Sequence, residues 1–455
     1  MAKPSPFPLM WDRRARRRTA PPRSGSKLPG LWTQAFMMFG FAVSSNAITL
    51  TLRFARGEEH LPPGQADIGN TLAQSIILLG ILIYFAGHRR VLYVHARALL
   101  PYILILMLCL LSVVWSQYPG LTVRRWFTLA SCIFFGLYCS ETAGLDGIIR
   151  IYGRTAIVLM IMSIVVYFAV PNLGHETAQG YTGAMRGVFA QKNTLGQCAA
   201  LAIACFAYRL LTKPRAPVAT VLALLMMLGC AVMAKAATSL GIAMVIIFVT
   251  AALYAMRLRI APLAVYALIA VAFIAALIAV LDPGLLFALM NRDTSLTGRT
   301  QLWQMSLQAA AERPWTGYGY AAFWNESSRT VQYIWLAIGW EAPSAHNTYI
   351  DILLVIGIPG LALYLWLWTH VIYVATQAAW RGNAPEATWI LLFMLVILAL
   401  NFDEGGVTGP DQFTAMMPAT LIFLWDWRRV NGRRRPHTRL ARASREVAGE
   451  IPSTV

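Results

Sequence analysis

The stretch APSAHNTYIDILLVIGIPGLALYL (residues 342–365) places a histidine and an asparagine directly before a run of mostly apolar residues. A helix needs about 20 such residues to cross the hydrocarbon of a bilayer. Asn347 is a residue type that often caps helices, and His346 tolerates an interface, so their position alone assigns neither a function. The run predicts a membrane helix with polar groups at its mouth.

The rest of the chain has the same character. Of its 455 residues, 58% are hydrophobic and 13% are charged. About twelve windows are long enough to span a bilayer: 31–52, 69–86, 98–115, 122–140, 152–170, 194–211, 217–234, 237–255, 261–281, 348–372, 387–401 and 412–427. Backbone polar groups must be paired in lipid, and these lengths suit helices rather than barrel strands. We therefore predict an all-α polytopic membrane protein.

Basic residues predict the orientation. With an even number of spans both termini share one side, which would hold 27 of the 38 Lys and Arg residues and leave 11 on the other. The richer side is expected to be cytoplasmic. Residues 1–30 and 428–455 are then basic cytoplasmic tails around a membrane domain at 31–427. The net charge of +18 reflects topology and contact with anionic lipids, not nucleic-acid binding.

No separately cleaved signal is expected, because the first window is long and no small-residue cleavage site follows it. The six cysteines all fall within predicted spans and form no CxxC pair, so we interpret them as small packing residues rather than disulfides or metal ligands.

Polar residues collect in two connections on the predicted outer face, 171–193 and 282–347. Loops of this length are more often functional than idle. In the first, Arg186 and Lys192 break the positive-inside bias, and Asn193 is placed to cap the following span. Each basic residue alone could equally be a solvated or snorkelling side chain.

The second connection predicts a short amphipathic helix, which Thr297 could cap and Pro314 would end. Arg299 falls in its first turn, where its positive charge opposes the helix dipole. This suggests either that function requires an arginine at this position or that an exposed arginine is simply tolerated there. The segment PWTGYGYAAFW (314–324) is interpreted either as an interfacial aromatic belt or as a stacking surface for sugars. Near the end of the eleventh window, Asn401, Asp403 and Glu404 are expected on the same face, where they could orient basic residues or accept a proton.

Four segments, in this order, resemble the O-antigen ligase and polysaccharide polymerase superfamily, most closely its exopolysaccharide-production (ExoQ-like) polymerase branch. The matching pieces are RGVFAQKNTLGQ (186–197), GRTQLW (298–303) with the aromatic segment after it, AHNTYIDILLVIGIPG (345–360) and NFDE (401–404). The family's serine after the last acid is replaced by Gly405, which puts the role of Glu404 in doubt.

The resemblance implies a metal-independent inner-membrane glycosyltransferase of the polytopic lipid-sugar (GT-C-like) class, with no cofactor. Such enzymes move a glycan from undecaprenyl diphosphate to an acceptor hydroxyl on the periplasmic face. It also implies catalytic roles for Arg186, Arg299 and His346. The residues expected to bind substrate are Lys192, Asn193, Asn347, Asn401 and Glu404.

Physical chemistry supports these roles. A departing diphosphate needs cationic groups, and the acceptor hydroxyl is a weak nucleophile that benefits from a general base such as histidine. Direct attack by that hydroxyl on the anomeric carbon would invert its configuration. His346 is the expected base, and His175 in the first loop is the competing histidine.

Two alternatives remain open. A ligase would use the same donor but transfer the glycan to the lipid A core, whereas a polymerase transfers it to a second lipid-linked unit and could have a chain-length regulator as a partner. A lipid-linked saccharide transporter also has many spans, although transporters tend to place charges at the midplane, and here they cluster at span ends and in outer loops.

Overall fold

The computed structural model describes residues 28–47, 68–177, 182–212, 217–257 and 299–380, together with the isolated positions 393, 394, 397, 400, 401, 419, 420 and 422. Within these ranges the chain is helical and contains no strand, apart from an isolated antiparallel bridge between His175 and Met185. The prediction of an all-α protein is confirmed for this part. The helices are α2 (Leu31–Ser44), α4 (Ile68–Gly87), α5 (Arg90–Val94), α6 (Ala96–Leu111), η1 (Ser112–Val114), α7 (Pro119–Ala169), α8 (Pro171–Gly174), α9 (Lys192–Thr212), α10 (Pro217–Met233), α11 (Ala237–Arg257), α14 (Arg299–Glu312), α15 (Arg329–Ile338) and α16 (Thr348–Trp380).

The apolar windows coincide with helices wherever the structure describes them. Four helical segments are long and apolar enough to cross a membrane: Gly69–Gly87, Ala96–Val114, Pro119–Ala169 and Thr348–His370. Three shorter apolar helices lie at Leu31–Ser44, Pro217–Met233 and Ala237–Phe248. The window 261–281, and all but isolated helical positions of 387–401 and 412–427, lie outside the described residues. The protein is thus a multi-pass membrane protein whose full set of spans remains a prediction.

One predicted span needs correction, because a glycine with positive φ interrupts its apolar run. The tenth window is not one straight helix, since α16 breaks at Gly357 (φ 67°). Hydropathy registers length and composition but not a change of direction, which explains this error. By contrast, the windows 122–140 and 152–170 are the two arms of α7, which are separated at Gly144 (φ 59°), so these two helices agree with the prediction.

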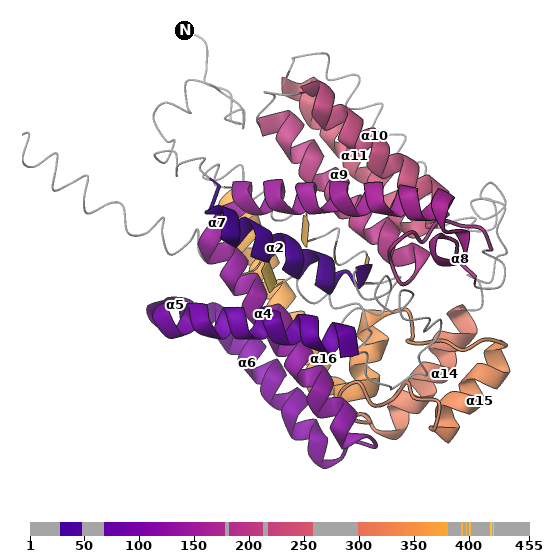
Figure 1. The fold of residues 1–455 in the computed structure, drawn as a ribbon. Helices are drawn as coiled ribbons and strands as arrows, with labels where there is room; N and C mark the ends of the chain where they lie inside the picture. The colour runs from indigo at the N-terminus through magenta and orange to yellow at the C-terminus, as the bar shows by residue number, and fades with distance from the viewer. Residues whose placement is uncertain are drawn as a thin grey trace, which may run out of the picture.

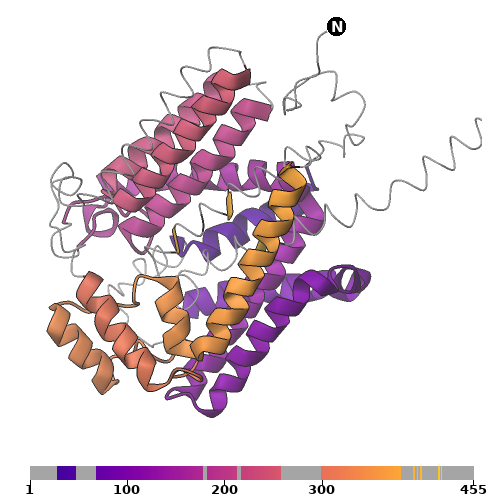
Figure 2. The same ribbon diagram turned by 180° about the vertical axis from the view of Figure 1, so that it is seen from behind.

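The helices form three packed groups (Figures 1 and 2). Helix α9 packs against α10, α11 and α7, while α2, α4 and α6 pack along α7. Helix α14 packs against α15 and α16, and α16 in turn contacts α6, which Figure 2 shows beside it. The candidate residues described below lie in the loops of the α14–α16 group and at the start of α9.

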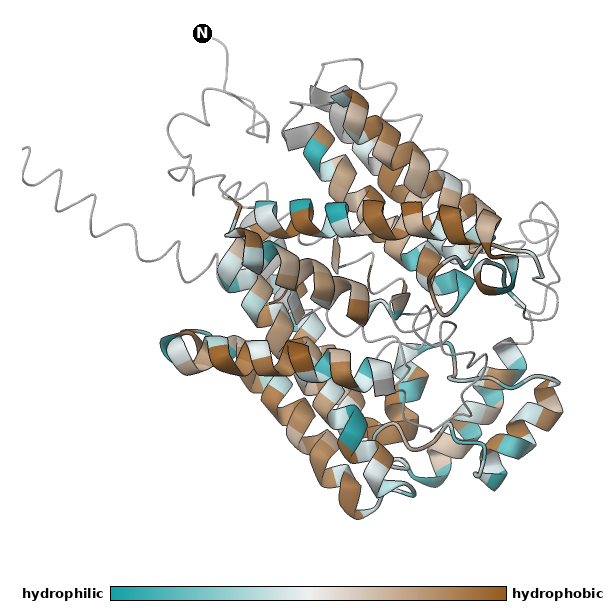
Figure 3. Ribbon diagram, in the orientation of Figure 1, coloured by the Kyte–Doolittle hydropathy of each residue, from teal (hydrophilic) through white to brown (hydrophobic). Residues whose placement is uncertain are grey.

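A lipid-facing surface is visible on α4. Leu72, Ile76, Leu79 and Ile83 recur three or four residues apart and are each more than half exposed. Figure 3 shows α4, α6 and α10 as largely brown, whereas α14 and α15 mix brown with teal. A continuous apolar stripe of this kind is unfavourable in water but suits hydrocarbon. The six cysteines are buried and free, as expected for packing residues.

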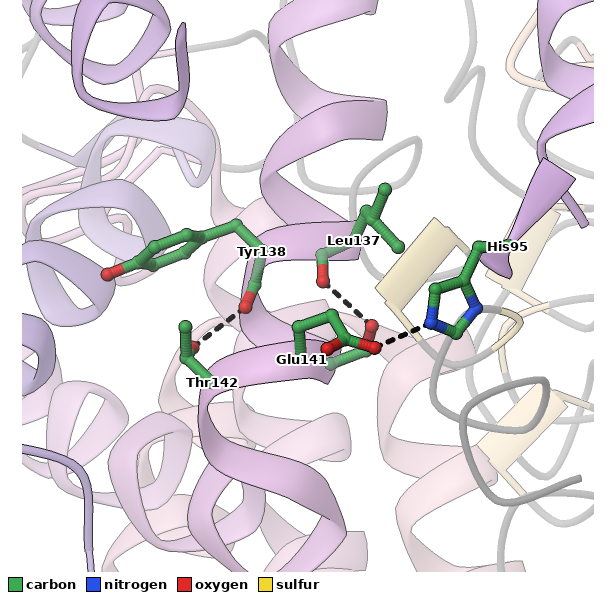
Figure 4. Close-up of polar contacts among 6 residues, drawn as sticks. His95, Leu137, Tyr138, Glu141 and Thr142 are labelled. Carbon is green, nitrogen blue, oxygen red and sulfur yellow. Dashed lines mark hydrogen bonds and ion pairs between the residues drawn. The ribbon is translucent and has the colours of Figure 1, made fainter. Parts of the chain in front are cut away.

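A polar pair lies beside the bend of α7 (Figure 4). The Nε2 atom of His95, which is 1% exposed, lies 2.5 Å from Oε1 of Glu141. Glu141 is three residues before Gly144, and the hydroxyls of Ser140 and Thr142 donate back to the carbonyls of Leu137 and Tyr138. Such back-bonding is common where helices bend. The pair ties the start of α6 to this bend.

Candidate active site

The N-terminal part of α16, residues 348–356, is a half-helix that folds back on the rest of the helix. The rings of Tyr349 and Tyr364 have centroids 6.1 Å apart. In a straight helix, residues this far apart in sequence would be separated by about 22 Å at 1.5 Å per residue. The break at Gly357 therefore reverses the chain, and residues 348–356 lie against the longer arm. His346 and Asn347 enter the bundle beside that arm rather than at its end.

The loop at 313–324 closes the break in α16 through backbone hydrogen bonds. The amides of Tyr318 and Gly319 donate to the carbonyls of Leu354 (2.8 Å) and Val355 (3.1 Å), and the amide of Ile358 donates to the carbonyl of Pro314 (2.7 Å). These bonds satisfy groups that the broken helix leaves unpaired, as membrane-depth backbone requires. The loop is a backbone clamp on the half-helix.

Glycine is required on both sides of this clamp. Gly317 has φ +62°, and a Cβ there would lie 2.5 Å from the carbonyl carbon of Val355. A Cβ on Gly357 would lie 2.6 Å from the carbonyl carbon of Trp315. Both positions thus combine a left-handed backbone with a close approach that excludes any side chain.

The aromatic residues of this loop are mostly core residues. Tyr318, Tyr320 and Phe323 are 3%, 4% and 1% exposed, so the expected sugar-stacking surface and interfacial belt are both wrong for these three rings. Trp315 remains 68% exposed. The Tyr318 hydroxyl donates to Oε2 of Glu312 (2.7 Å), and burial followed by the nearby Glu312 carboxylate raises the pKa of Tyr318 to about 12.

Three indole groups from three different elements fix the segment that carries His346. Trp303 of α14 donates to the carbonyl of Ala345 (2.8 Å) and Trp335 of α15 donates to the carbonyl of Ala342 (2.9 Å). Trp324 of the clamp donates to Oδ1 of Asp351 (2.8 Å). The segment 342–347 is therefore held from α14, α15 and α16 together.

His346 itself has a left-handed backbone, with φ 49°. Its amide donates to Oγ of Ser344 (3.2 Å), its ring centroid lies 5.6 Å from that of Trp340, and the residue is 7% exposed. Residues other than glycine rarely adopt positive φ, and such strain collects at functional sites. The surrounding contacts thus fix the backbone that carries this imidazole.

Asn347 caps the half-helix, as its residue type predicted. Its Oδ1 accepts hydrogen bonds from the amides of Tyr349 (3.0 Å) and Ile350 (3.3 Å).

Asn347→Ala is expected to lower the free energy of unfolding by about 1 kcal/mol, because two first-turn amides lose their acceptor. Thermal unfolding in detergent measures this, with Asn347→Asp as the variant that keeps the cap. An unchanged melting temperature in the alanine variant would show that the cap contributes nothing.

Asp351 was not singled out from the sequence. It is fully buried, and its Oδ1 accepts the Ala345 amide (3.0 Å) in addition to the Trp324 indole. An acid within an apolar span is itself a signal of function, and that signal could have identified it.

A second group of candidate residues lies at the start of α9. The Lys192 ammonium, in a residue 8% exposed, donates to Oδ1 of Asn193 and to the carbonyl of Lys235, both at 3.3 Å. Asn193 lies inside the first turn, so the expectation that it caps the helix is wrong. The acceptor for the Lys192 amide is instead Oε2 of Glu176 (3.1 Å). Sequence analysis missed Glu176, because it caps from a distant part of the loop.

Arg186 is partly anchored to α8. Its Nε donates to the carbonyl of Leu173 (3.0 Å) and its Nη2 to that of Asn172 (3.3 Å). The amide of Met185 donates to the carbonyl of Met233 (3.0 Å), which fastens this loop to the turn between α10 and α11. Lys235, in that turn, is exposed and has φ 50°. The structure thus gathers Arg186, Lys192 and the previously unnoticed Lys235 at one end of α9 and α10.

The remaining predicted residues divide in three ways. Arg299 is the first residue of α14, as expected for the first turn. Asn401 is 1% exposed and donates through Nδ2 to the Tyr364 hydroxyl (2.7 Å). Its side chain is therefore packed against α16 rather than accessible at the end of its own helix. Thr297, Asp403 and Glu404 lie outside the described residues.

The competing histidine has a structural neighbour. The ring of His175 lies 4.4 Å from that of Tyr167, and its backbone pairs with Met185. Across the described ranges no group of three or more His, Cys, Asp or Glu side chains is placed to hold a metal ion.

Comparison with known proteins identifies the region that contains the His346 segment. Residues 221–365 match the Wzy_C family, described as O-Antigen ligase. This stretch therefore resembles an O-antigen ligase domain. The match begins within α10 and includes α11, α14, α15 and the half-helix of α16, while Arg186 and Lys192 precede it.

Two relatives extend this result. The chain is 28% identical over 298 residues to the "Exopolysaccharide production protein ExoQ" of Rhizobium meliloti (strain 1021), covering 63% of this chain and 67% of that protein. It is also 28% identical over 155 residues to the "General O-oligosaccharyltransferase" of Acinetobacter baylyi (strain ATCC 33305 / BD413 / ADP1), covering 30% of this chain and 26% of that protein. The resemblance to the ligase and polymerase superfamily, and to its ExoQ branch, is confirmed. These similarities support an enzyme of the ligase and polymerase type.

Proposed function

We propose that this protein is an inner-membrane glycosyltransferase that moves a glycan from undecaprenyl diphosphate to an acceptor sugar hydroxyl on the periplasmic face. The observation that carries the proposal is His346, held in a left-handed conformation by contacts from three elements within the O-antigen ligase domain. A base must be kept in position to accept the hydroxyl proton as the new bond forms.

The proposed reaction is a direct displacement. The acceptor oxygen attacks the anomeric carbon, the bond from that carbon to the diphosphate breaks with its electron pair leaving on the diphosphate, and His346 takes the hydroxyl proton. The anomeric configuration inverts. No metal or other cofactor takes part in the proposed step.

Cationic groups would stabilise the departing diphosphate. Lys192 suits this role because its ammonium is buried beside the neutral oxygens of Asn193 and Lys235, where an anionic ligand would interact with it strongly. Arg186 and Lys235 lie at the same end of α9 and α10. Arg299, at the start of α14, would also approach the diphosphate, with Asn193, Asn347 and Glu404 as further proposed substrate contacts, whereas the burial of Asn401 against Tyr364 favours a packing role for that residue.

A polymerase that joins repeat units is the favoured form of this activity, since the longer match is to a protein named for exopolysaccharide production. Transfer to the lipid A core is the second candidate, which the family description and the oligosaccharyltransferase relative support.

Deleting the gene and analysing carrier-bound glycans tests this proposal. A polymerase deletion is expected to accumulate single lipid-linked repeat units, whereas a ligase deletion would accumulate long lipid-linked chains. A deletion strain with unchanged lipid-linked and exported glycans would contradict both forms.

The proposed orientation gives a separate prediction. In a background without the six native cysteines, Thr182→Cys and Ser327→Cys should react with a membrane-impermeant thiol reagent added to intact spheroplasts, since both positions are exposed in outer loops. Arg89→Cys, exposed between α4 and α5, should react only after lysis. Labelling of position 89 from outside would overturn the assignment of faces.

A further inference from the structure

Asp351 has an unusual set of partners for a buried acid. Its Oδ1 accepts two hydrogen bonds, from the Ala345 amide and the Trp324 indole, while Oδ2 is buried and has no hydrogen-bond partner among the described residues. Leaving a buried carboxylate oxygen unpaired is costly. The two existing bonds alone would be served as well by an asparagine, whose Oδ1 is also an acceptor. An aspartate at this position therefore needs a reason beyond these bonds.

The position of His346 suggests why an aspartate stands at position 351. The Ala345 amide that Asp351 binds belongs to the residue directly before the histidine. The same carboxylate fixes Trp324, which belongs to the clamp around the broken helix. Asp351 is thus placed to hold the backbone turn that carries the imidazole ring.

We propose that Asp351 is a positioning residue that holds His346 and stabilises its positively charged form. This inference rests on the proposed role of His346 as the base. As the acceptor hydroxyl gives up its proton, the imidazole becomes an imidazolium, and a fixed carboxylate nearby lowers the energy of that state. Asp351 has no exposed surface, so it acts through His346 and not on the substrate.

A double-mutant cycle separates this role from a purely structural one. Asp351→Asn keeps the size and the Oδ1 acceptor but removes the charge. For the reconstituted full-length protein with a lipid-diphosphate glycan donor, we expect kcat to fall about 10- to 100-fold, as for other supporting carboxylates, with the donor KM little changed. In a His346→Ala background, the same substitution should cause no further loss of the residual rate.

Two tryptophan variants provide a second test and a control. Trp324→Phe removes one donor to Asp351, so its smaller loss of kcat should also vanish in the His346→Ala background. Trp126→Phe removes an equivalent indole bond, from Trp126 to the carbonyl of Leu106 (2.7 Å), between α7 and α6. Any loss that the Trp126 variant causes should persist in the His346→Ala background.

The outcomes are distinct. If Asp351→Asn keeps full kcat, or if the Asp351 and Trp324 effects multiply with the His346→Ala effect as the Trp126 effect does, the positioning role is overturned while the proposed function stands. If Asp351→Asn does not fold, the Trp324→Phe cycle decides by the same criterion. Full turnover in His346→Ala itself would instead reject the proposed role of His346, and this inference with it.

Discussion

Replacing His346 by alanine is expected to lower turnover by about 10²- to 10⁴-fold while leaving the affinity for the lipid-diphosphate donor nearly intact. The reason is that a general base contributes to the chemical step rather than to donor binding. Turnover of the wild type should also fall on the acidic side of its pH profile, because protonation removes the lone pair that accepts the hydroxyl proton. The measurement is kcat and donor binding for purified, folded protein across pH.

The matched control is His175→Ala, which removes the competing histidine of the other predicted outer loop and its ring contact with Tyr167. It should retain turnover. Two results would contradict the role of His346 as base. Weakened donor binding in His346→Ala, with wild-type activity rising as pH falls, would make the histidine a cationic donor to the diphosphate. Poor folding with normal specific activity in the surviving His346→Ala protein would make it structural.

Substituting Arg186, Lys192 or Arg299 by alanine should each cost about 2–4 kcal/mol of transition-state stabilisation, or roughly a 30- to 1,000-fold loss of kcat/KM. Lys192→Ala is expected to show the largest loss, because its ammonium is buried and the field of a buried charge is less screened. Arg299→Lys should recover only part, since lysine cannot form the bidentate contact.

Arg186→Ala should also lower thermal stability, because the Leu173 and Asn172 carbonyls of α8 lose their donors. The control is Arg150→Ala, which removes a cation paired with Asp146 (2.6 Å) on the predicted opposite face and should leave kcat/KM unchanged. Near-normal kcat/KM in two of the three outer-face variants would show that this cluster is only a solvated surface.

The sequence was informative where a property is local. Apolar length located α4, α6, α9, α10 and α11 within a few residues. Residue type predicted the cap at Asn347, which needs only neighbouring amides. Pro314 likewise marked the end of α14.

The sequence was uninformative where a feature depends on contacts between distant segments. Nothing local to Gly357 states that the amides of Tyr318 and Gly319 will replace the lost helical bonds, so the tenth window was read as one straight span. The indole bonds to Ala342 and Ala345 join residues on separate helices, so tryptophans that fix the His346 segment were indistinguishable from interfacial ones.

The central claim is covalent glycan transfer, and reconstitution tests it most directly. Purified protein in liposomes should be supplied with a single repeat unit linked to undecaprenyl diphosphate, and the products separated by mass. The account predicts longer lipid-linked glycans, with one free undecaprenyl diphosphate released for each new linkage, and almost none of either with His346→Ala. Donor that stays intact, or that crosses the bilayer without forming any new glycosidic bond, would contradict it.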